Sequence, residues 1–195
     1  MAKPNGLFLT PGAGSNADNP SLKAIEAAVG DAMPVIRHDF PYRREGRRAP
    51  DRAPKAIADI LEHVPGPGWV LGGRSFGGRM CSMAVAEGYT AAGLVLICYP
   101  LHPPGKPQQL RTEHLPNLAV PCLFLSGTKD QFGSPAELEA ATKAIPGEVT
   151  HVWVEGKDHS LRNADAFIAT TVTDWLRGLR GSAPRARGAR SRGTA

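Results

Sequence analysis

A glycine-rich turn between an apolar run and a helix-compatible run constrains the fold of this chain more than any other segment. Residues 69–71 read Trp-Val-Leu, and the following turn places Gly73 two residues before Ser75 and Gly77 two residues after it. This spacing is typical of a nucleophile elbow, in which a serine stands at a sharp strand-to-helix turn and glycines let the two backbones approach. The alternative interpretation is a glycine-rich turn with an incidental serine.

Strand-like and helix-like segments alternate along the 195 residues. Alternation of this kind is typical of a parallel sheet with helices on both faces, and the length suits one domain. The predicted strands cover residues 7–10, 35–40, 69–71, 92–97, 120–125 and 149–154, and the main predicted helices cover 20–29, 51–63, 79–87, 135–145 and 163–179. We therefore expect an α/β fold with three layers, α/β/α, around a mostly parallel sheet of about six strands.

The formal net charge of +5 is concentrated at the C-terminal end of the chain. Residues 179–195 contain no acidic residue and five arginines, which equal the whole excess: Arg180, Arg185, Arg187, Arg190 and Arg192. A segment with so few apolar side chains cannot offset its ordering entropy, so we expect a disordered basic tail after a domain spanning 1–178. We favour a solvated end over a nucleic-acid contact, because basic termini without a docking module carry little specificity.

Neither a membrane segment nor a disulfide framework is indicated. The longest wholly apolar run, residues 94–99, is too short to span a bilayer, and the first residues lack an apolar leader, which favours a cytoplasmic location. The three cysteines are far apart and none belongs to a C-x-x-C pair: Cys81, Cys98 and Cys122. We expect them to be reduced and structural, with no zinc site.

An acid and a histidine follow Ser75 in the chain order Ser, Asp, His. Asp130 comes just past a buried strand, and His159 follows the last strand. Ser75 would attack an acyl carbonyl, His159 would take and return the proton, and Asp130 would orient the imidazole. Asp158 is a rival acid, but side chains adjacent in a loop diverge, so we prefer Asp130.

Two backbone sites are expected to form an oxyanion hole. The N–H of Phe76 opens the helix after the serine, and the loop after the first strand supplies a second donor from Ala13 or Gly14, where small residues allow close approach.

Possible substrate-binding residues lie in two further loops. Tyr42 and Arg43 belong to a basic and aromatic loop after the second strand, where ligands bind in open α/β sheets. The alternative is a solvated charge run with Tyr42 packed beneath it. Tyr99 and His102 begin a proline-rich segment, residues 100–116, whose prolines disfavour a helical cap and favour an open pocket.

Taken together, these motifs resemble the α/β-hydrolase superfamily over roughly residues 6–178. The similar segments are residues 10–14, 40–42, 73–77, 99–104, 127–130 and 156–160. They look like a small single-domain group that includes testis-expressed protein 30 and the hydrolase-like domain of non-specific lethal complex subunit 3, and they are similar to dienelactone hydrolases, which have cysteine in place of Ser75. The resemblance implies a sheet without the first two strands of larger members, a Ser-Asp-His triad and no cap domain. Many relatives have histidine where this chain has Pro11.

The sequence thus predicts a serine hydrolase that cleaves a small carboxylic ester or thioester and needs no cofactor or metal. The alternative is a non-catalytic binding or scaffold protein that uses the basic loop or the tail. The complete Ser-Asp-His set argues against it, because a scaffold has no need for three polar groups in register.

Overall fold

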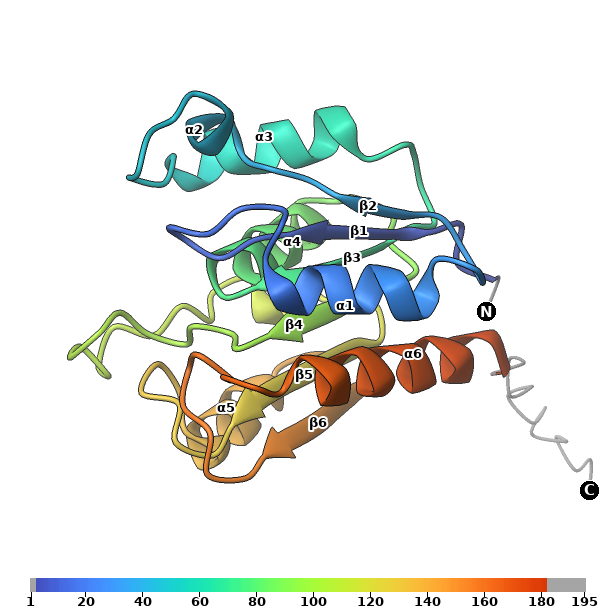
Figure 1. The fold of residues 1–195 in the computed structure, drawn as a ribbon. Coiled ribbons are helices and arrows are strands. Elements are labelled where there is room, and N and C mark those ends of the chain that lie inside the picture. The colour runs from blue at the N-terminus through green and yellow to red at the C-terminus, as the bar shows by residue number, and fades with distance from the viewer. Residues whose placement is uncertain (1–2, 182–195) are drawn as a thin grey trace, which may run out of the picture.

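The chain folds around one six-stranded sheet, described in a computed structural model for residues 3–181. All strands are parallel, in the order β2-β1-β3-β4-β5-β6 (Figure 1). They are β1 (Leu7–Thr10), β2 (Val35–Arg37), β3 (Val70–Arg74), β4 (Gly93–Ile97), β5 (Cys122–Gly127) and β6 (Val149–Val154). The helices are α1 (Pro20–Val29), α2 (Pro41–Arg44), α3 (Ala53–His63), α4 (Phe76–Ala86), α5 (Pro135–Thr142) and α6 (Asp165–Gly181), with a short 3₁₀ helix η1 (Leu115–Asn117).

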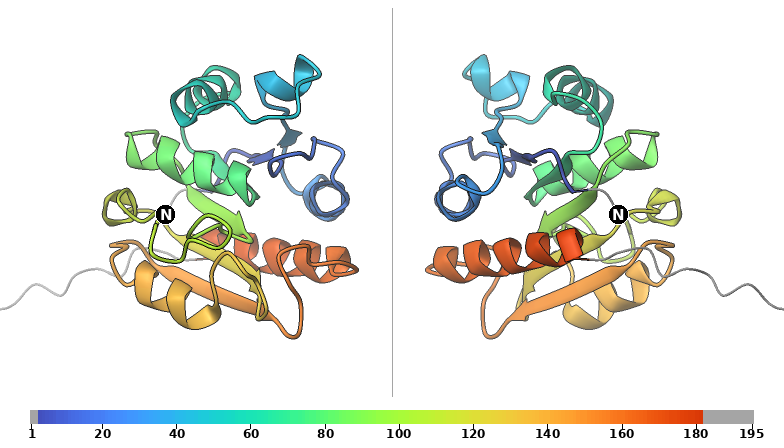
Figure 2. Two further views of the ribbon diagram at one scale, coloured as in Figure 1. Left: turned by 90° about the vertical axis from the view of Figure 1, so that its left-hand side faces the viewer. Right: turned by 90° about the vertical axis from the view of Figure 1, so that its right-hand side faces the viewer.

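Helices cover both faces of the sheet. Helices α1 and α6 pack together on one face, and α3, α4 and α5 lie on the other (Figure 2). Successive strand side chains point to opposite faces, so Leu7 and Leu9 join the core beneath α1 and α6 while Phe8 joins the core beneath α3 and α4. The predicted three-layer α/β/α class is confirmed.

The parallel arrangement brings the carboxyl ends of all six strands to one edge, the left-hand edge in Figure 1. Loops that leave β1, β3, β5 and β6 therefore meet there although they are far apart in sequence. Within the described residues, the only helical element between β4 and β5 is η1, so no helical cap is inserted at this point, as expected from the prolines.

Some element boundaries differ from the prediction. Strand β2 ends at Arg37, and the segment expected to be a loop after it contains α2. Pro41 stands at the first position of α2 after an extended Phe40, and the Asp51 carboxylate accepts the Tyr42 N–H at 3.0 Å, which satisfies a donor at the start of this helix. Helix α6 continues to Gly181, and the rest of the predicted basic tail lies outside the described residues. No helix in the described part is long and apolar enough to cross a membrane.

Candidate active site

Ser75 stands in a strained turn between β3 and α4. Its backbone has φ 50° and ψ −114°, a region that non-glycine residues rarely adopt. A Cβ at Gly73 would lie 2.4 Å from the carbonyl oxygen of Thr10, and one at Gly77 would lie 2.5 Å from that of Pro11. Only glycine permits this approach of the elbow to β1, so the two glycines have the steric role that the motif predicts.

Three polar side chains from separate loops form a continuous chain beside this turn. Ser75 Oγ lies 2.9 Å from His159 Nε2, and His159 Nδ1 lies 2.8 Å from one Asp130 oxygen and 3.0 Å from the other. Asp130 is 5% exposed, whereas Ser75 and His159 are half-buried. The structure thus brings together the three side chains that the sequence pointed to, with the imidazole between the hydroxyl and a buried carboxylate.

Asp130, rather than Asp158, faces the imidazole. The Asp130 carboxylate also accepts the backbone N–H of Phe132 at 2.9 Å, which holds it in place. Asp158 instead accepts the N–H and hydroxyl of Ser160 within its own turn, at 2.9 and 2.6 Å, and these bonds lower its pKa. Asp158 therefore stabilises the loop that carries His159.

Arg74, the residue between Gly73 and Ser75, ties that loop to the sheet. Its guanidinium donates to the carbonyl oxygen of His159 at 2.8 Å, to that of Ser160, and to the hydroxyl of Ser21 at 3.1 Å. One side chain thereby connects the backbone of the nucleophile turn to the backbone of the imidazole loop.

The expected oxyanion donors lie beside Ser75. Phe76 is the first residue of α4, where a backbone N–H has no intrahelical partner. Ala13 and Phe76 line the same cavity as Ser75, and a Cβ at Gly12 would lie 3.5 Å from Ser75 Cβ, so the loop after β1 touches the elbow. Gly14, the other expected donor, is not among the residues that line this cavity.

An open cavity of about 520 Å³ adjoins these groups. It is lined by Ala13, Pro50, Asp51, Ala53, Ser75, Phe76, Arg79, Pro100, Pro104, Arg111, Phe132 and His159. The Phe132 ring packs against the imidazole of His159 with a centroid separation of 4.2 Å. A space of this size is sufficient for a small organic ester.

The four residues proposed to bind substrate are not among the residues that line this cavity. Tyr42 is fully buried beneath the surface, and Tyr99 is buried with its hydroxyl donating to the Arg111 carbonyl oxygen at 2.9 Å. His102 is 4% exposed, and its Nδ1 donates to the Pro103 carbonyl oxygen at 3.0 Å. Arg43 is half-buried outside the cavity wall.

Two neighbouring arginines of the basic loop form ion pairs within the protein. Arg44 pairs with Asp59 at 2.7 Å, and Arg47 pairs with Asp51 at 2.8 Å. The cavity takes its positive charge instead from Arg79 and Arg111, which sequence analysis missed. Arg79 could have been found, because it lies four residues after Ser75 and so shares its helical face. Arg111 has no such local signal.

The cysteines and the possible metal-ligating groups already have protein partners. Burial raises the pKa of Cys81, Cys98 and Cys122 to about 12, which keeps these thiols protonated. Two clusters in the described chain bring three possible ligand atoms within 4.8 Å: His38, Asp59 and His63, and Cys98, Asp130 and His159. In the first, the Arg44 guanidinium contacts both Asp59 and His38, so these two groups are already paired with a cation. The second overlaps the chain of hydrogen bonds at Ser75.

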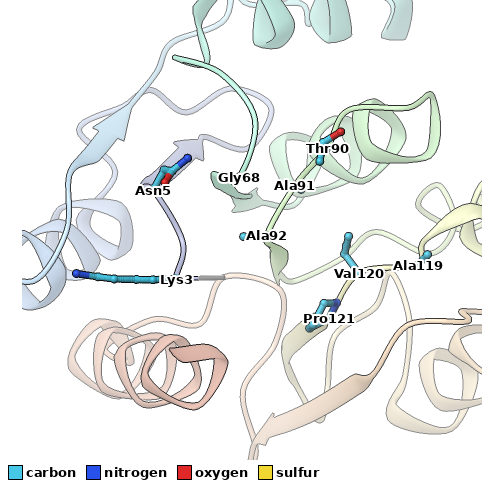
Figure 3. A pocket seen from close by; sticks show the side chains of 9 residues that line it. All are labelled: Lys3, Asn5, Gly68, Thr90, Ala91, Ala92, Ala119, Val120 and Pro121. Carbon is cyan, nitrogen blue, oxygen red and sulfur yellow. The ribbon is translucent and has the colours of Figure 1, made fainter. Parts of the chain in front are cut away.

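A second hollow lies at the opposite, amino-terminal edge of the sheet (Figure 3). It is lined by Lys3, Asn5, Gly68, Thr90, Ala91, Ala92, Ala119, Val120 and Pro121. Its lining holds one charged side chain and lacks a nucleophile paired with a base. The reactive side chains described above therefore lie at the carboxyl edge of the sheet, away from this hollow.

The parallel sheet and the serine elbow define this chain as an α/β-hydrolase protein. A family model described as an alpha/beta hydrolase domain matches residues 3–178, and the chain belongs to this family.

Solved structures share the fold at low identity. Mouse alpha/beta hydrolase domain-containing protein 10 is 18% identical with a TM-score of 0.68, over 89% of this chain and 90% of that one. Est1E from Butyrivibrio proteoclasticus, solved with ferulic acid, is 13% identical with a TM-score of 0.75, over 91% and 90%. A monoacylglycerol lipase from Paleococcus ferrophilus is 15% identical with a TM-score of 0.72, over 92% and 97%.

Proposed function

We propose that this protein is a serine hydrolase that cleaves a small carboxylic ester or thioester through an acyl-enzyme. The observation that carries the proposal is the uninterrupted contact from Ser75 Oγ through the imidazole of His159 to the buried carboxylate of Asp130, with distances of 2.9 and 2.8 Å. This arrangement opens onto a cavity large enough for a small substrate. A nucleophile, a base and an orienting acid in this order are the requirements of acyl transfer.

In the first half-reaction, Ser75 Oγ attacks the carbonyl carbon while its proton passes to His159 Nε2. The carbonyl oxygen becomes an oxyanion, which the backbone N–H groups of Phe76 and Ala13 stabilise. Collapse of this intermediate breaks the bond to the alcohol or thiol, which leaves with the proton from His159. An ester of Ser75 remains.

In the second half-reaction, water attacks the Ser75 ester and gives its proton to His159. The acid product leaves, and the proton returns to Ser75 Oγ. Asp130 keeps Nδ1 protonated, so that Nε2 faces the serine as the base, and stabilises the imidazolium in both steps.

The esterases and the lipase among the structural neighbours agree with this reaction class, and their low identity to this chain leaves the substrate open. The likeness to dienelactone hydrolases and to testis-expressed protein 30 stays a prediction from the motifs. Within residues 3–181, no specific contact favours the scaffold alternative, and most of the basic tail lies outside these residues.

Labelling with a fluorophosphonate tests the proposal directly. The wild-type protein should be modified at Ser75, and Ser75→Ala should not react. The variant Thr170→Ala is the control, because it removes an exposed hydroxyl on α6 and leaves the nucleophile turn and the His159 loop unchanged. Hydrolysis of 4-nitrophenyl acetate should follow the same pattern. Equal labelling of wild type and Ser75→Ala, or no labelling of either, contradicts the proposed function.

A further inference from the structure

We infer that the cavity beside Ser75 selects esters that carry a second, anionic group of the carboxylate class, held by Arg79 and Arg111. This inference rests on the proposed hydrolase function and specifies its substrate. Both arginines line the cavity together with Ser75, Phe76 and His159. An anion bound between them would lie in the same space as the reacting carbonyl.

Neither guanidinium has a counter-ion within the part of the chain that the structure describes. No hydrogen bond or ion pair joins the side chain of Arg79 or of Arg111 to those residues, and Nε of Arg79 is buried without a partner. Three other arginines near this edge, Arg44, Arg47 and Arg74, are held by carboxylates or carbonyl oxygens. Arg43 also has a buried Nε without a partner, but it lies outside the cavity that Ser75 lines. Buried polar groups are normally hydrogen-bonded, so an unpaired half-buried arginine pair at a cavity indicates a place for an external acceptor.

The electrostatics of the two side chains support the same conclusion. Burial lowers the pKa of Arg111, and the positive charge of Arg79 lowers it further. Arginine stays charged despite such a shift, so two cations repel each other across a partly desolvated space. A carboxylate between them would remove the repulsion and supply planar, bidentate acceptors that match a guanidinium.

The one carboxylate in the cavity wall does not fill this role. Asp51 is held by Arg47 at 2.8 Å and Lys55 at 3.3 Å, and it also accepts the Tyr42 N–H at 3.0 Å. These bonds lower the Asp51 pKa and keep its charge engaged outside the arginine pair. The net charge offered to a ligand is therefore positive.

The position of each arginine also suits a reaction at Ser75. Arg79 lies one helical turn after Ser75 in α4, and its N–H donates to the Ser75 carbonyl oxygen at 3.1 Å. Arg111 is held by backbone contacts, with its N–H donating to the Leu101 carbonyl oxygen at 2.8 Å and its own carbonyl accepting the Tyr99 hydroxyl at 2.9 Å. Both side chains are thus carried by anchored backbone, which lowers the entropy lost on binding.

Two matched pairs of esters test this inference with the full-length protein. Mono-4-nitrophenyl adipate is compared with its neutral methyl ester, and 4-acetoxybenzoate with methyl 4-acetoxybenzoate. The first pair places the anion on the acyl side and the second on the leaving group. We expect kcat/KM to be at least about tenfold higher for the anionic member of one pair, because hydrogen bonds to charged groups are the stronger kind.

Variants identify the residues responsible. Arg79→Gln and Arg111→Gln should each reduce the anionic-to-neutral ratio of kcat/KM by about tenfold or more. Arg52→Gln is the matched control, because Arg52 is exposed beside the cavity residues Asp51 and Ala53 but does not line the cavity. The substitution removes one positive charge, as the other two variants do. It should leave the ratio unchanged. Turnover of the neutral esters by each variant reports that it is folded.

The possible results distinguish failure of the anion-selective cavity from failure of the hydrolase function. Equal turnover of both members in both pairs, or a ratio that survives both arginine substitutions, overturns the anion-selective cavity while leaving the hydrolase intact. No turnover of any of the four esters, together with an unlabelled Ser75, overturns the hydrolase and with it the inference about its substrate.

Discussion

Arg74 contributes to the site although it touches neither the hydroxyl nor the imidazole ring. Its bonds to the carbonyl oxygens of His159 and Ser160 set the position of the imidazole loop relative to the nucleophile turn. Misplacement of a catalytic group by about 1 Å can cost on the order of a hundredfold in rate. Arg74 is therefore a positioning residue, and its loss should act on the chemical step.

We expect Arg74→Met, which keeps the apolar stem, to lower kcat for 4-nitrophenyl acetate by about tenfold to a hundredfold while KM changes little. Arg74→Lys should recover part of the loss, because one ammonium can still donate to a carbonyl oxygen. Steady-state kinetics checks this, with the exposed Arg177→Met on α6 as the control. An unchanged kcat, or a rise in KM alone, would contradict the positioning role.

The second prediction for single residues concerns the glycines of the elbow. An alanine Cβ at position 77 would lie 2.5 Å from the Pro11 carbonyl oxygen, closer than carbon and oxygen can pack, so β1 and α4 would have to separate. We expect Gly77→Ala to lower the free energy of unfolding by at least about 1–3 kcal/mol and to reduce Ser75 labelling.

Gly178→Ala is the control for this substitution. A Cβ there meets nothing within 4 Å in α6, and alanine is the better helix former, so the free energy of unfolding should rise by up to about 1 kcal/mol. Urea denaturation measures both variants. A Gly77→Ala protein as stable as the wild type would show that the elbow can relax without cost.

Among the helices, α5 has the most complete N-terminus. Ser134 and Glu137 form a capping box, in which the Ser134 hydroxyl and the Glu137 carboxylate each accept the other residue's N–H. Helix α3 begins at Ala53, and its N-cap residue Arg52 makes no side-chain capping bond. We expect Ser134→Ala to cost about 0.5–2 kcal/mol in the free energy of unfolding and Arg52→Ala to cost less than about 0.5 kcal/mol. Thermal and urea unfolding of the two variants measures these changes. Equal losses of unfolding free energy would show that the capping box does not stabilise the protein.

Elements with a strong local pattern were predicted well from the sequence. Strands β1 and β6 have the predicted bounds, because apolar runs between turn signals define them. Helix α2 was missed, since four residues that begin with a proline contain too little periodicity to reveal a helix. The carboxylate that accepts the Tyr42 N–H at its start comes from Asp51, nine positions away.

The residues of the site also differ in whether a local sequence pattern reveals them. Ser75, Asp130 and His159 could be found because each follows a strand that the pattern reveals, and parallel strands end at one edge. The walls of the cavity could not be found in the same way. Arg111 is brought there by long-range backbone contacts with Leu101 and Tyr99, and Tyr42 and His102 were expected near substrate but are withdrawn into the core by packing.

For the molecule as a whole, three half-buried histidines predict how stability depends on pH. Burial is the main cause that lowers the pKa of His38, His114 and His151, and for His114 the charge of Arg79 adds to it and brings the pKa to about 4. In the unfolded chain these groups titrate near 6.5. Between about pH 4 and 6.5 the unfolded state therefore binds more protons, so the free energy of unfolding falls as the pH decreases through this window. The lowered pKa values of Asp51 and Glu137 act below it, near the ordinary carboxyl range.

His114→Gln isolates one part of this dependence. Its Nε2 lies 2.8 Å from Ser82 Oγ, a contact that a glutamine amide can replace without titrating. In this variant we expect the loss of unfolding free energy between pH 7 and pH 5 to be smaller than in the wild type by about 1–2 kcal/mol, after allowance for screening by solvent. The loss that remains arises from His38 and His151. Ser82→Ala removes the same hydrogen bond but keeps the titrating ring, so it should be less stable at every pH with an unchanged slope. Urea denaturation at the two pH values measures both effects. If His114→Gln retains the wild-type slope, His114 is not the group that links protonation to unfolding, and the acid sensitivity must arise at the other two rings.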